Sequence, residues 1–184
     1  MIIAVSAAVL GGVFTWTFLE YVIHRWMGHD RRMRGTPFAL EHIRHHAEGN
    51  YFAPNWKKVV AAALASVIVG IPAVLIGGVL GVAYVLGLMG FYGVYELVHR
   101  RQHVHPGIGP YGRWARRHHF THHFVDARCN HGVTTSLWDH VFGTYRAPKT
   151  IPVPRRLCMP WLKDPATGDV RQDWADTFVL RGSP

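Results

Sequence analysis

The chain has 184 residues, of which 49 % are hydrophobic and 17 % are charged, and its only cysteines are Cys129 and Cys158. This composition excludes a disordered chain, a collagen and a small secreted protein held together by disulfides. The 20 Lys and Arg residues outnumber the 11 Asp and Glu residues, which gives a formal net charge of +9, and 14 residues are histidine. Net charge alone still leaves open a basic nucleic-acid-binding protein.

Two long segments carry a single charged residue each. Residues 1–23 contain only Glu20, and residues 59–98 contain only Glu96. The second segment would form about 60 Å of helix, which is twice the roughly 30 Å that one crossing of a bilayer requires. We therefore predict three membrane spans, one over residues 1–23 and two within residues 59–98 that turn near residues 77–78. The first span lacks the basic start of a cleaved signal peptide.

The basic residues all lie outside these spans, at 25–58 and 100–181. Three crossings place both basic segments on one side of the membrane, and the positive-inside rule assigns that side to the cytoplasm. Topology therefore accounts for the positive charge. Because the sequence also contains no helix-turn-helix, zinc-finger or RNA-binding signature, we expect no nucleic-acid partner.

The sequence becomes mixed and rich in proline after Ala147. We predict a membrane-embedded catalytic domain over residues 1–147 and an irregular cytoplasmic tail over residues 148–184. Trp161 and Leu162 are expected to touch the membrane surface from this tail.

The histidines fall into two clusters, one after the first span and one after the third, so both are expected on the cytoplasmic side. Ten of them form one HxxxxH pair, one HxxxH pair and two HxxHH triplets. Offsets of three and four residues share one face of a helix. The other histidines except His131 receive no role. The ten are His24, His29, His42, His45, His46, His99, His103, His119, His122 and His123.

Metal binding is the simplest reason to gather so many imidazoles. Neutral imidazoles are costly to assemble without a partner, and protonated ones would repel each other, whereas a metal ion takes the neutral ring. Ten ligands suit two ions with five each. The ten are accompanied by no cysteine and the sequence has no HExxH motif, which argues against structural zinc and against a zinc protease. Imidazole suits Zn, Cu, Fe and Ni, so ligand type alone does not name the metal.

The order of these motifs and the residues around them resemble the fatty acid hydroxylase/sterol desaturase superfamily. The matching text is EYVIHRWMGH at 20–29, HIRHH at 42–46 and HHFTHHFVDARCNHGVTTSLWDHVFGT at 118–144. The last stretch is the most specific, and the resemblance covers roughly residues 15–145.

The resemblance implies an all-α, integral-membrane bundle of about three to four membrane helices, capped by a cytosolic, histidine-lined dimetal site. It implies that the ten histidines bind two iron ions, with zinc able to replace iron in purified protein. The expected activity is that of a di-iron monooxygenase that uses O2 to hydroxylate a fatty acyl chain, free or in a complex lipid. Electrons would come from an external donor of the ferredoxin or cytochrome b5 type.

Three carboxylates lie near the ligand histidines in the sequence. Glu20, Glu96 and Asp139 are candidates to hold the far nitrogens of those histidines and so fix their tautomers. The alternatives are an ion pair of Glu96 with Arg100 at the helix end and a structural cap for Asp139. His131 stands where the family commonly has an aromatic residue, and it is either an additional ligand or a residue that supports the ligands from behind.

Other functions remain open from the sequence. The same chemistry serves carotenoid ring hydroxylases and sterol hydroxylases or desaturases. A histidine-rich membrane metal transporter would place its ligands near the middle of the bilayer. A zinc-dependent membrane hydrolase would not need O2.

Overall fold

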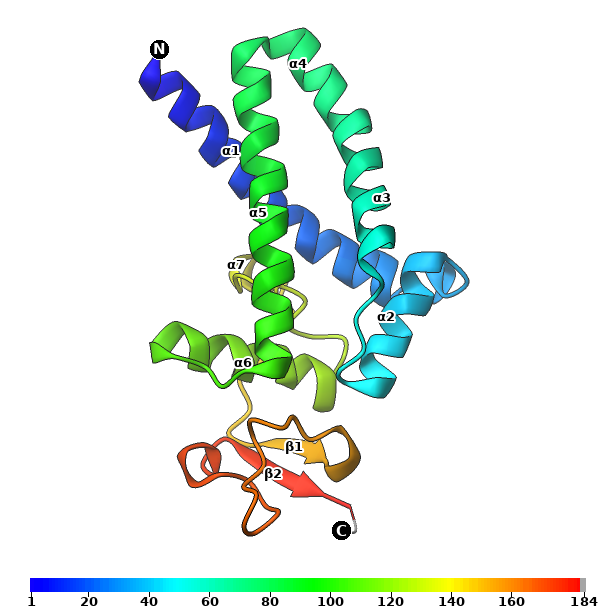
Figure 1. The fold of residues 1–184 in the computed structure, drawn as a ribbon, viewed down its shortest axis with the longest axis vertical. Coiled ribbons are helices and arrows are strands. Elements are labelled where there is room, and N and C mark those ends of the chain that lie inside the picture. Colours follow the sequence, from blue (N-terminus) through cyan, green and yellow to red (C-terminus); the bar gives the residue numbers. More distant parts are fainter. Residues whose placement is uncertain (183–184) are drawn as a thin grey trace. The chain divides into compact units, whose positions relative to one another are not determined.

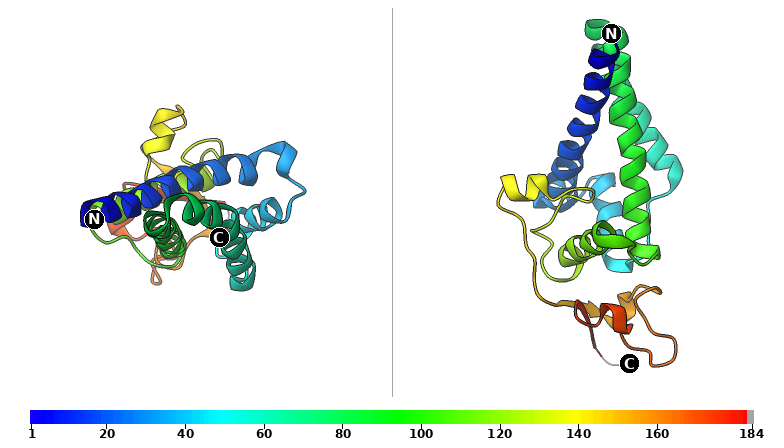
Figure 2. Two further views of the ribbon diagram at one scale, coloured as in Figure 1. Left: turned by 90° about the horizontal axis from the view of Figure 1, so that it is seen from above. Right: turned by 90° about the vertical axis from the view of Figure 1, so that its left-hand side faces the viewer.

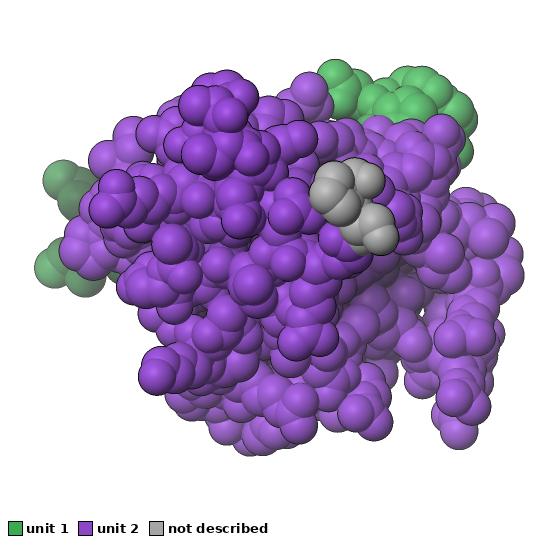
Figure 3. All heavy atoms as spheres, turned by 90° about the horizontal axis from the view of Figure 1, so that it is seen from below, with its two compact units in different colours: residues 1–19, 53–97 green, residues 20–52, 98–184 purple. Residues whose placement is uncertain are grey.

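The computed structural model describes residues 1–182 and is mostly helical, which confirms the predicted all-α class (Figures 1 and 2). It contains two compact units, coloured separately in Figure 3. The first unit comprises Met1–Leu19 and Ala53–Leu97, and the second comprises Glu20–Phe52 and the chain from Val98 onward.

The first unit is built from apolar helices. Within residues 1–182, three stretches are long and apolar enough to cross a membrane, namely Ile2–Gly28, Asn55–Gly77 and Val79–Val104, so the three predicted spans are confirmed. In lipid, a helix satisfies every backbone polar group internally. The turn between the last two spans falls at Gly78, whose φ of 53° favours glycine. The elements are α1 (Ile2–Val22), α3 (Asn55–Ala65), a π-helical turn (Ser66–Gly70), α4 (Ile71–Gly77) and α5 (Val79–Val104).

The helices α1 and α5 pack closely within this unit. A Cβ at Gly12 of α1 would overlap a backbone carbonyl of α5, and a Cβ at Gly87 of α5 would overlap one of α1. Such contacts between small residues are typical of membrane helices. The Trp16 ring lies 4.8 Å from the Tyr92 ring and extends the same contact. Both spans reach further along the chain than predicted, so His24, His99 and His103 lie on helical turns at their ends.

The second unit combines helices with short irregular elements. α2 is capped at its N-terminus by Thr36, whose hydroxyl accepts a hydrogen bond from the Ala39 N–H, and at its C-terminus by Gly49, which has a φ of 68°. The elements are a π-helical turn (Ile23–Gly28), a 3-10 turn (Arg31–Met33), α2 (Pro37–Glu48), the end of α5, α6 (Gly109–Phe124), α7 (Leu137–Val141), β1 (Ile151–Pro154), 3-10 turns (Arg155–Leu157 and Gln172–Trp174) and β2 (Phe178–Arg181).

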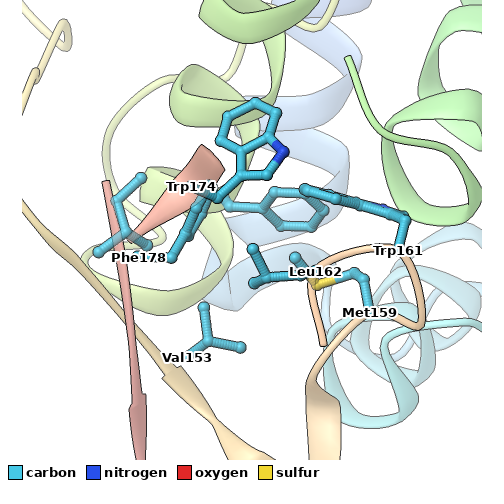
Figure 4. Packing of buried hydrophobic residues seen from close by; sticks show 8 residues of the cluster. Val153, Met159, Trp161, Leu162, Trp174 and Phe178 are labelled. Carbon is cyan, nitrogen blue, oxygen red and sulfur yellow. The ribbon is translucent and has the colours of Figure 1, made fainter. Parts of the chain in front are cut away.

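Between residues 148 and 182, apolar side chains pack into a core (Figure 4), called here the C-terminal core. β1 and β2 form a parallel pair in which Ile151 faces Phe178. Buried apolar side chains of this segment cover Phe120 of α6; they are Ile151, Val153, Met159, Trp161, Leu162, Trp174 and Phe178.

This core corrects the expected position of two residues. Trp161 is 7 % exposed and Leu162 is 0 % exposed, so neither is available to a membrane surface. The proline-rich composition suggested an irregular segment, but the two strands and the aromatic cluster order it by burying apolar area. The division of the chain into a catalytic domain and a tail at residue 147 stays a prediction.

Candidate metal centre

Four segments of the second unit carry the ten histidines of the sequence motifs. The π-helical turn and the residue after it supply His24 and His29, and the last turns of α5 supply His99 and His103. The triplets lie on α2 and α6. The ten imidazoles gather into two sets of five, the first histidine group (His24, His29, His42, His46 and His122) and the second histidine group (His45, His99, His103, His119 and His123).

Each group is compact and made of imidazole alone. One ring nitrogen from each member lies within 4.8 Å of the corresponding nitrogens of the others. Within residues 1–182, neither group includes a carboxylate or a thiolate. Five nitrogens that each lie about 2.1 Å from one ion are at most about 4.2 Å apart, so the span of each group fits one transition-metal ion after a small inward adjustment.

Ring nitrogens within a group approach each other closely. In the first group, the Nε2 atoms of His29 and His42 are 2.8 Å apart, and those of His46 and His122 are 3.2 Å apart. In the second group, the Nε2 atoms of His103 and His119 are 2.7 Å apart. Such pairs of like atoms need a shared proton or a bound cation between them.

The two groups touch each other. The ring of His46 in the first group stacks on the ring of His123 in the second, with centroids 4.1 Å apart and planes 13° apart. Two ions held by these groups would therefore be neighbours.

Each HxxHH triplet is divided between the groups. On α2, His42 and His46 belong to the first group while His45 belongs to the second. On α6 the division is reversed, since His122 joins the first group and the pair His119 and His123 joins the second. Offsets of three and four residues fall on opposite sides of a helix face, so one helix serves two neighbouring sites. The sequence left this division open.

Backbone carbonyls orient three of the imidazoles. Nδ1 of His24 lies 2.6 Å from the His131 carbonyl, Nδ1 of His45 lies 2.6 Å from the Tyr51 carbonyl, and Nδ1 of His122 lies 2.7 Å from the Cys129 carbonyl. A carbonyl only accepts, so each Nδ1 carries the proton and each Nε2 presents a lone pair to its group. These carbonyls were missed in the sequence, because backbone acceptors leave no residue-type signal.

The electrostatics keep the rings neutral. Burial, and then repulsion from neighbouring imidazoles, lowers the pKa of His42, His46, His119, His122 and His123 well below its usual value. Burial lowers the pKa of His29 to about 4, with a further contribution from His131. Within the described residues, Nε2 of His24 and both ring nitrogens of His123 are buried without a hydrogen-bond partner. Buried lone pairs without partners are what two metal ions would satisfy, so the residues fit such a pair.

The carboxylates expected behind the histidines have other partners. Glu20 accepts hydrogen bonds from the N–H groups of Val133 and Thr134, at 3.0 and 2.8 Å, and from the Thr134 hydroxyl. Glu96 forms an ion pair with Lys58 of α3. The observed partners are therefore a loop for Glu20 and a lysine for Glu96, whereas we had considered ligand histidines as their partners.

Asp139 also holds this loop. Its carboxylate accepts hydrogen bonds from the N–H groups of His131 and Gly132, at 2.8 and 2.9 Å, and from the Thr144 hydroxyl at 2.7 Å. Its histidine partner is His118, at 3.2 Å, which belongs to neither group. Since the His131 carbonyl orients His24, Asp139 acts on the first group through the backbone.

His131 lies beside the first group. Its ring centroid is 5.5 Å from that of His24, 5.6 Å from that of His29 and 5.3 Å from that of His122. It is 2 % exposed, and its Nδ1 is buried without a partner among the described residues. His105 and His140, which received no role, are exposed.

Fold and site together define an integral membrane protein whose second unit carries two adjoining imidazole groups suited to metal ions. The family model for fatty acid hydroxylases matches residues 9–144, and the chain belongs to this family.

Curated relatives agree with that assignment. The chain is 30 % identical to the dihydroceramide fatty acyl 2-hydroxylase FAH1 of Arabidopsis thaliana, over 77 % of this chain and 61 % of the relative. It is 31 % identical to the ceramide very long chain fatty acid hydroxylase SCS7 of Saccharomyces cerevisiae, over 74 % of this chain and 37 % of the relative. The chain is also 28 % identical to the fatty acid 2-hydroxylase of Homo sapiens, over 75 % of this chain and 39 % of the relative. The chain thus spans less than two thirds of each of these relatives.

A solved structure also matches. It is described as full length scs7p with only the hydroxylase domain visible, and it aligns with a TM-score of 0.61 and 25 % identity. The alignment covers 79 % of this chain and 57 % of the other.

Proposed function

We propose that the protein is a membrane-bound di-iron monooxygenase that hydroxylates a fatty acyl chain, free or within a complex lipid. The observation that carries the proposal is the pair of adjoining five-imidazole groups, which contain no carboxylate within residues 1–182. The names of the relatives, which are hydroxylases of fatty acids, dihydroceramide acyl chains or ceramide, support a fatty acyl substrate over a sterol or a carotenoid ring.

In this proposal each histidine group holds one iron ion. The two irons would supply the redox chemistry with O2 that an unactivated C–H bond requires and that side chains do not offer. The overall reaction consumes the C–H bond, O2, two electrons and two protons, and it yields the alcohol and one water.

Several groups of the chain fix the tautomers of the ligand histidines and shield them from water. The carbonyls of Tyr51, Cys129 and His131 fix the ring tautomers, so the lone pairs are in place before any ligand binds. Phe52 packs against the second group, with its ring centroid 5.4 Å from His45 and 5.5 Å from His103, and shields that group from water.

Topology and partners complete the proposal. The basic segments that flank the spans support a cytoplasmic position for the histidine groups. Electrons would come from a separate protein of the ferredoxin or cytochrome b5 type. The catalytic domain would comprise residues 1–147.

The test is turnover by purified protein loaded with iron, in a lipid extract, under ¹⁸O2 and with dithionite as reductant. We expect one ¹⁸O atom in a hydroxylated acyl chain, and no product from His45→Ala or His122→Ala. Protein purified without added iron is expected to contain some zinc, so metal content is measured alongside. The absence of any O2-dependent product from protein with two irons per chain would disprove the proposal, and metal transport across a vesicle membrane would favour a transporter.

A further inference from the structure

A pocket of about 370 Å³ lies along one face of α6. Its lining on α6 recurs every three or four residues, at Arg113, Trp114, Arg117 and His118 among others. By helical spacing, this face lies on the opposite side of α6 from the three ligand histidines of that helix. Tyr145 and Arg146 close the pocket from the segment after α7.

The pocket is strongly basic. Arg113 donates to the Asp173 carbonyl at 3.0 Å, and Arg117 donates to the Pro148 carbonyl at 3.3 Å. Both acceptors are neutral carbonyls, so neither hydrogen bond pairs the guanidinium group with a carboxylate. Arg113 also lies over the Trp174 ring, 4.9 Å from its centroid. Arg146 pairs with Asp126 at 3.2 Å, but its side chain is 56 % exposed, so the pair is weak. Among the described residues, none that lines the pocket is acidic.

Stacked rings form the inner wall of the pocket. The ring of the buried His118 stacks between Trp114, at 5.1 Å, and Tyr145, at 5.7 Å, with interplanar angles of 24° and 22°. Trp114 and Tyr145 are partly exposed, so the stack leads from the surface into the protein.

The inner end of this stack connects to both histidine groups. His118 adjoins His119 of the second group through one peptide bond. Its Nε2 lies 3.2 Å from Asp139, which accepts from the His131 N–H, and the His131 carbonyl accepts from His24 of the first group. Short covalent and hydrogen-bonded routes therefore join the pocket to both groups.

We propose that this pocket is the docking site for an acidic one-electron carrier protein, a proposal that rests on the proposed hydroxylase function. An acyl chain must touch the metals to react, and this pocket lies behind the helix that carries the ligands. An electron crosses packed and bonded atoms and needs no such opening. Carboxylates on the carrier would complement Arg113 and Arg117, whose guanidinium groups bind carboxylates through two parallel hydrogen bonds.

The electron count is consistent with repeated docking. Each turnover needs two electrons, so two reduced carriers dock in succession, and each leaves oxidised by one electron. These two electrons and two protons reduce the second oxygen atom of O2 to water.

The experiment compares the unaltered full chain with Arg113→Gln/Arg117→Gln in nanodiscs. The probes are a reduced [2Fe–2S] ferredoxin and the soluble domain of cytochrome b5, and the dissociation constant of each is measured at low and high salt. We expect roughly tenfold weaker binding and a shallower salt dependence in the variant for at least one probe. Arg32→Gln, which alters an exposed arginine of the turn before α2, serves as the matched control and should bind like the unaltered chain.

Turnover separates docking from the chemistry. With dithionite, which needs no docking site, the double variant should match the unaltered chain in rate and metal content, whereas with the carrier its KM should rise. The single variant Arg117→Gln, which leaves the contact of Arg113 with the C-terminal core intact, should shift KM in the same direction by a smaller factor.

Several results would overturn the docking site. Unchanged carrier affinity and KM in both variants would do so. The docking site would also be overturned if the double variant lost dithionite-driven turnover and if the size of this loss depended on anionic lipid in the nanodisc. That result would indicate a site for lipid headgroups. Absence of product from the unaltered chain with dithionite would instead contradict the hydroxylase function, and carrier affinity is measured independently of that result.

Discussion

The two histidine groups differ in what holds them. All members of the second group lie on the regular helices α2, α5 and α6. The first group takes His24 from a π-helical turn and His29 from the residue after it, and two of its members are oriented by carbonyls of residues 129 and 131. The second group is therefore positioned mainly by helix packing, with the Tyr51 carbonyl orienting His45. The first group depends in addition on the loop that Glu20 and Asp139 hold in place.

The residues that surround the two histidine groups differ as well. The first group has His131 as a sixth imidazole neighbour, and the second group has Phe52 and the C-terminal core as neighbours. Two ions bound here would not be equivalent, and variants that affect one group more than the other can test this comparison.

The largest effect is expected from removing one ligand at a time. His122→Ala should lower metal content from about two ions per chain to about one and abolish turnover, and His123→Ala should do the same at the other group. Metal analysis together with the spectrum of cobalt-substituted protein would show which ion is lost. His140→Ala, at an exposed position, is the control. Identical spectra for the two ligand variants would contradict two distinct sites.

The next largest effect is expected at Asp139. Asp139→Asn removes a buried charge that receives two backbone hydrogen bonds, so we expect a loss on the order of 2–4 kcal/mol in the free energy of unfolding. The first group should lose its metal at a lower chelator concentration than the second. Asp164→Asn, which lies outside this loop, is the control. Simultaneous loss of both ions would argue against a selective effect through the loop.

Acid should destabilise the metal-free protein. His29 has a pKa of about 4 when folded, against about 6.5 for an unperturbed histidine, because burial disfavours its charged form. Between these values the unfolded chain binds a proton that the folded chain does not, so stability falls as pH drops from about 6.5 to 4. His29→Gln should make this slope shallower by up to about 1.4 kcal/mol per pH unit, as measured by unfolding in denaturant. A slope unaffected by this change would refute the assignment.

The smallest effect is expected at Trp161. Its Nε1 donates to the His103 carbonyl at 3.0 Å, and this hydrogen bond links the C-terminal core to the end of α5. Trp161→Phe should lower the free energy of unfolding by about 1 kcal/mol and should weaken metal binding in the second group only. Trp56→Phe, at an exposed position, is the control, and a preferential loss from the first group would contradict the comparison.

The sequence predicted the parts of this molecule that periodicity and charge encode. The spans follow from long uncharged segments, and the ten histidines follow from offsets of three, four and five residues. The partners of Glu20 and Asp139 could not be predicted in this way, because the loop they hold is brought to them by tertiary structure. The same is true of Trp161, whose apolar ring fits a membrane surface and a protein core equally well.

Phe120 lies beside the ligand imidazoles of α6, with its ring near those of His119 and His123, and the C-terminal segment covers it. The family similarity ends at residue 144, before the C-terminal core begins. A protein shortened to the region of similarity would keep all ten imidazoles but would expose an apolar strip along α6 to water. Such a protein should be expected to aggregate or to bind metal poorly, so the full C-terminal segment belongs in any minimal version made for biochemical work.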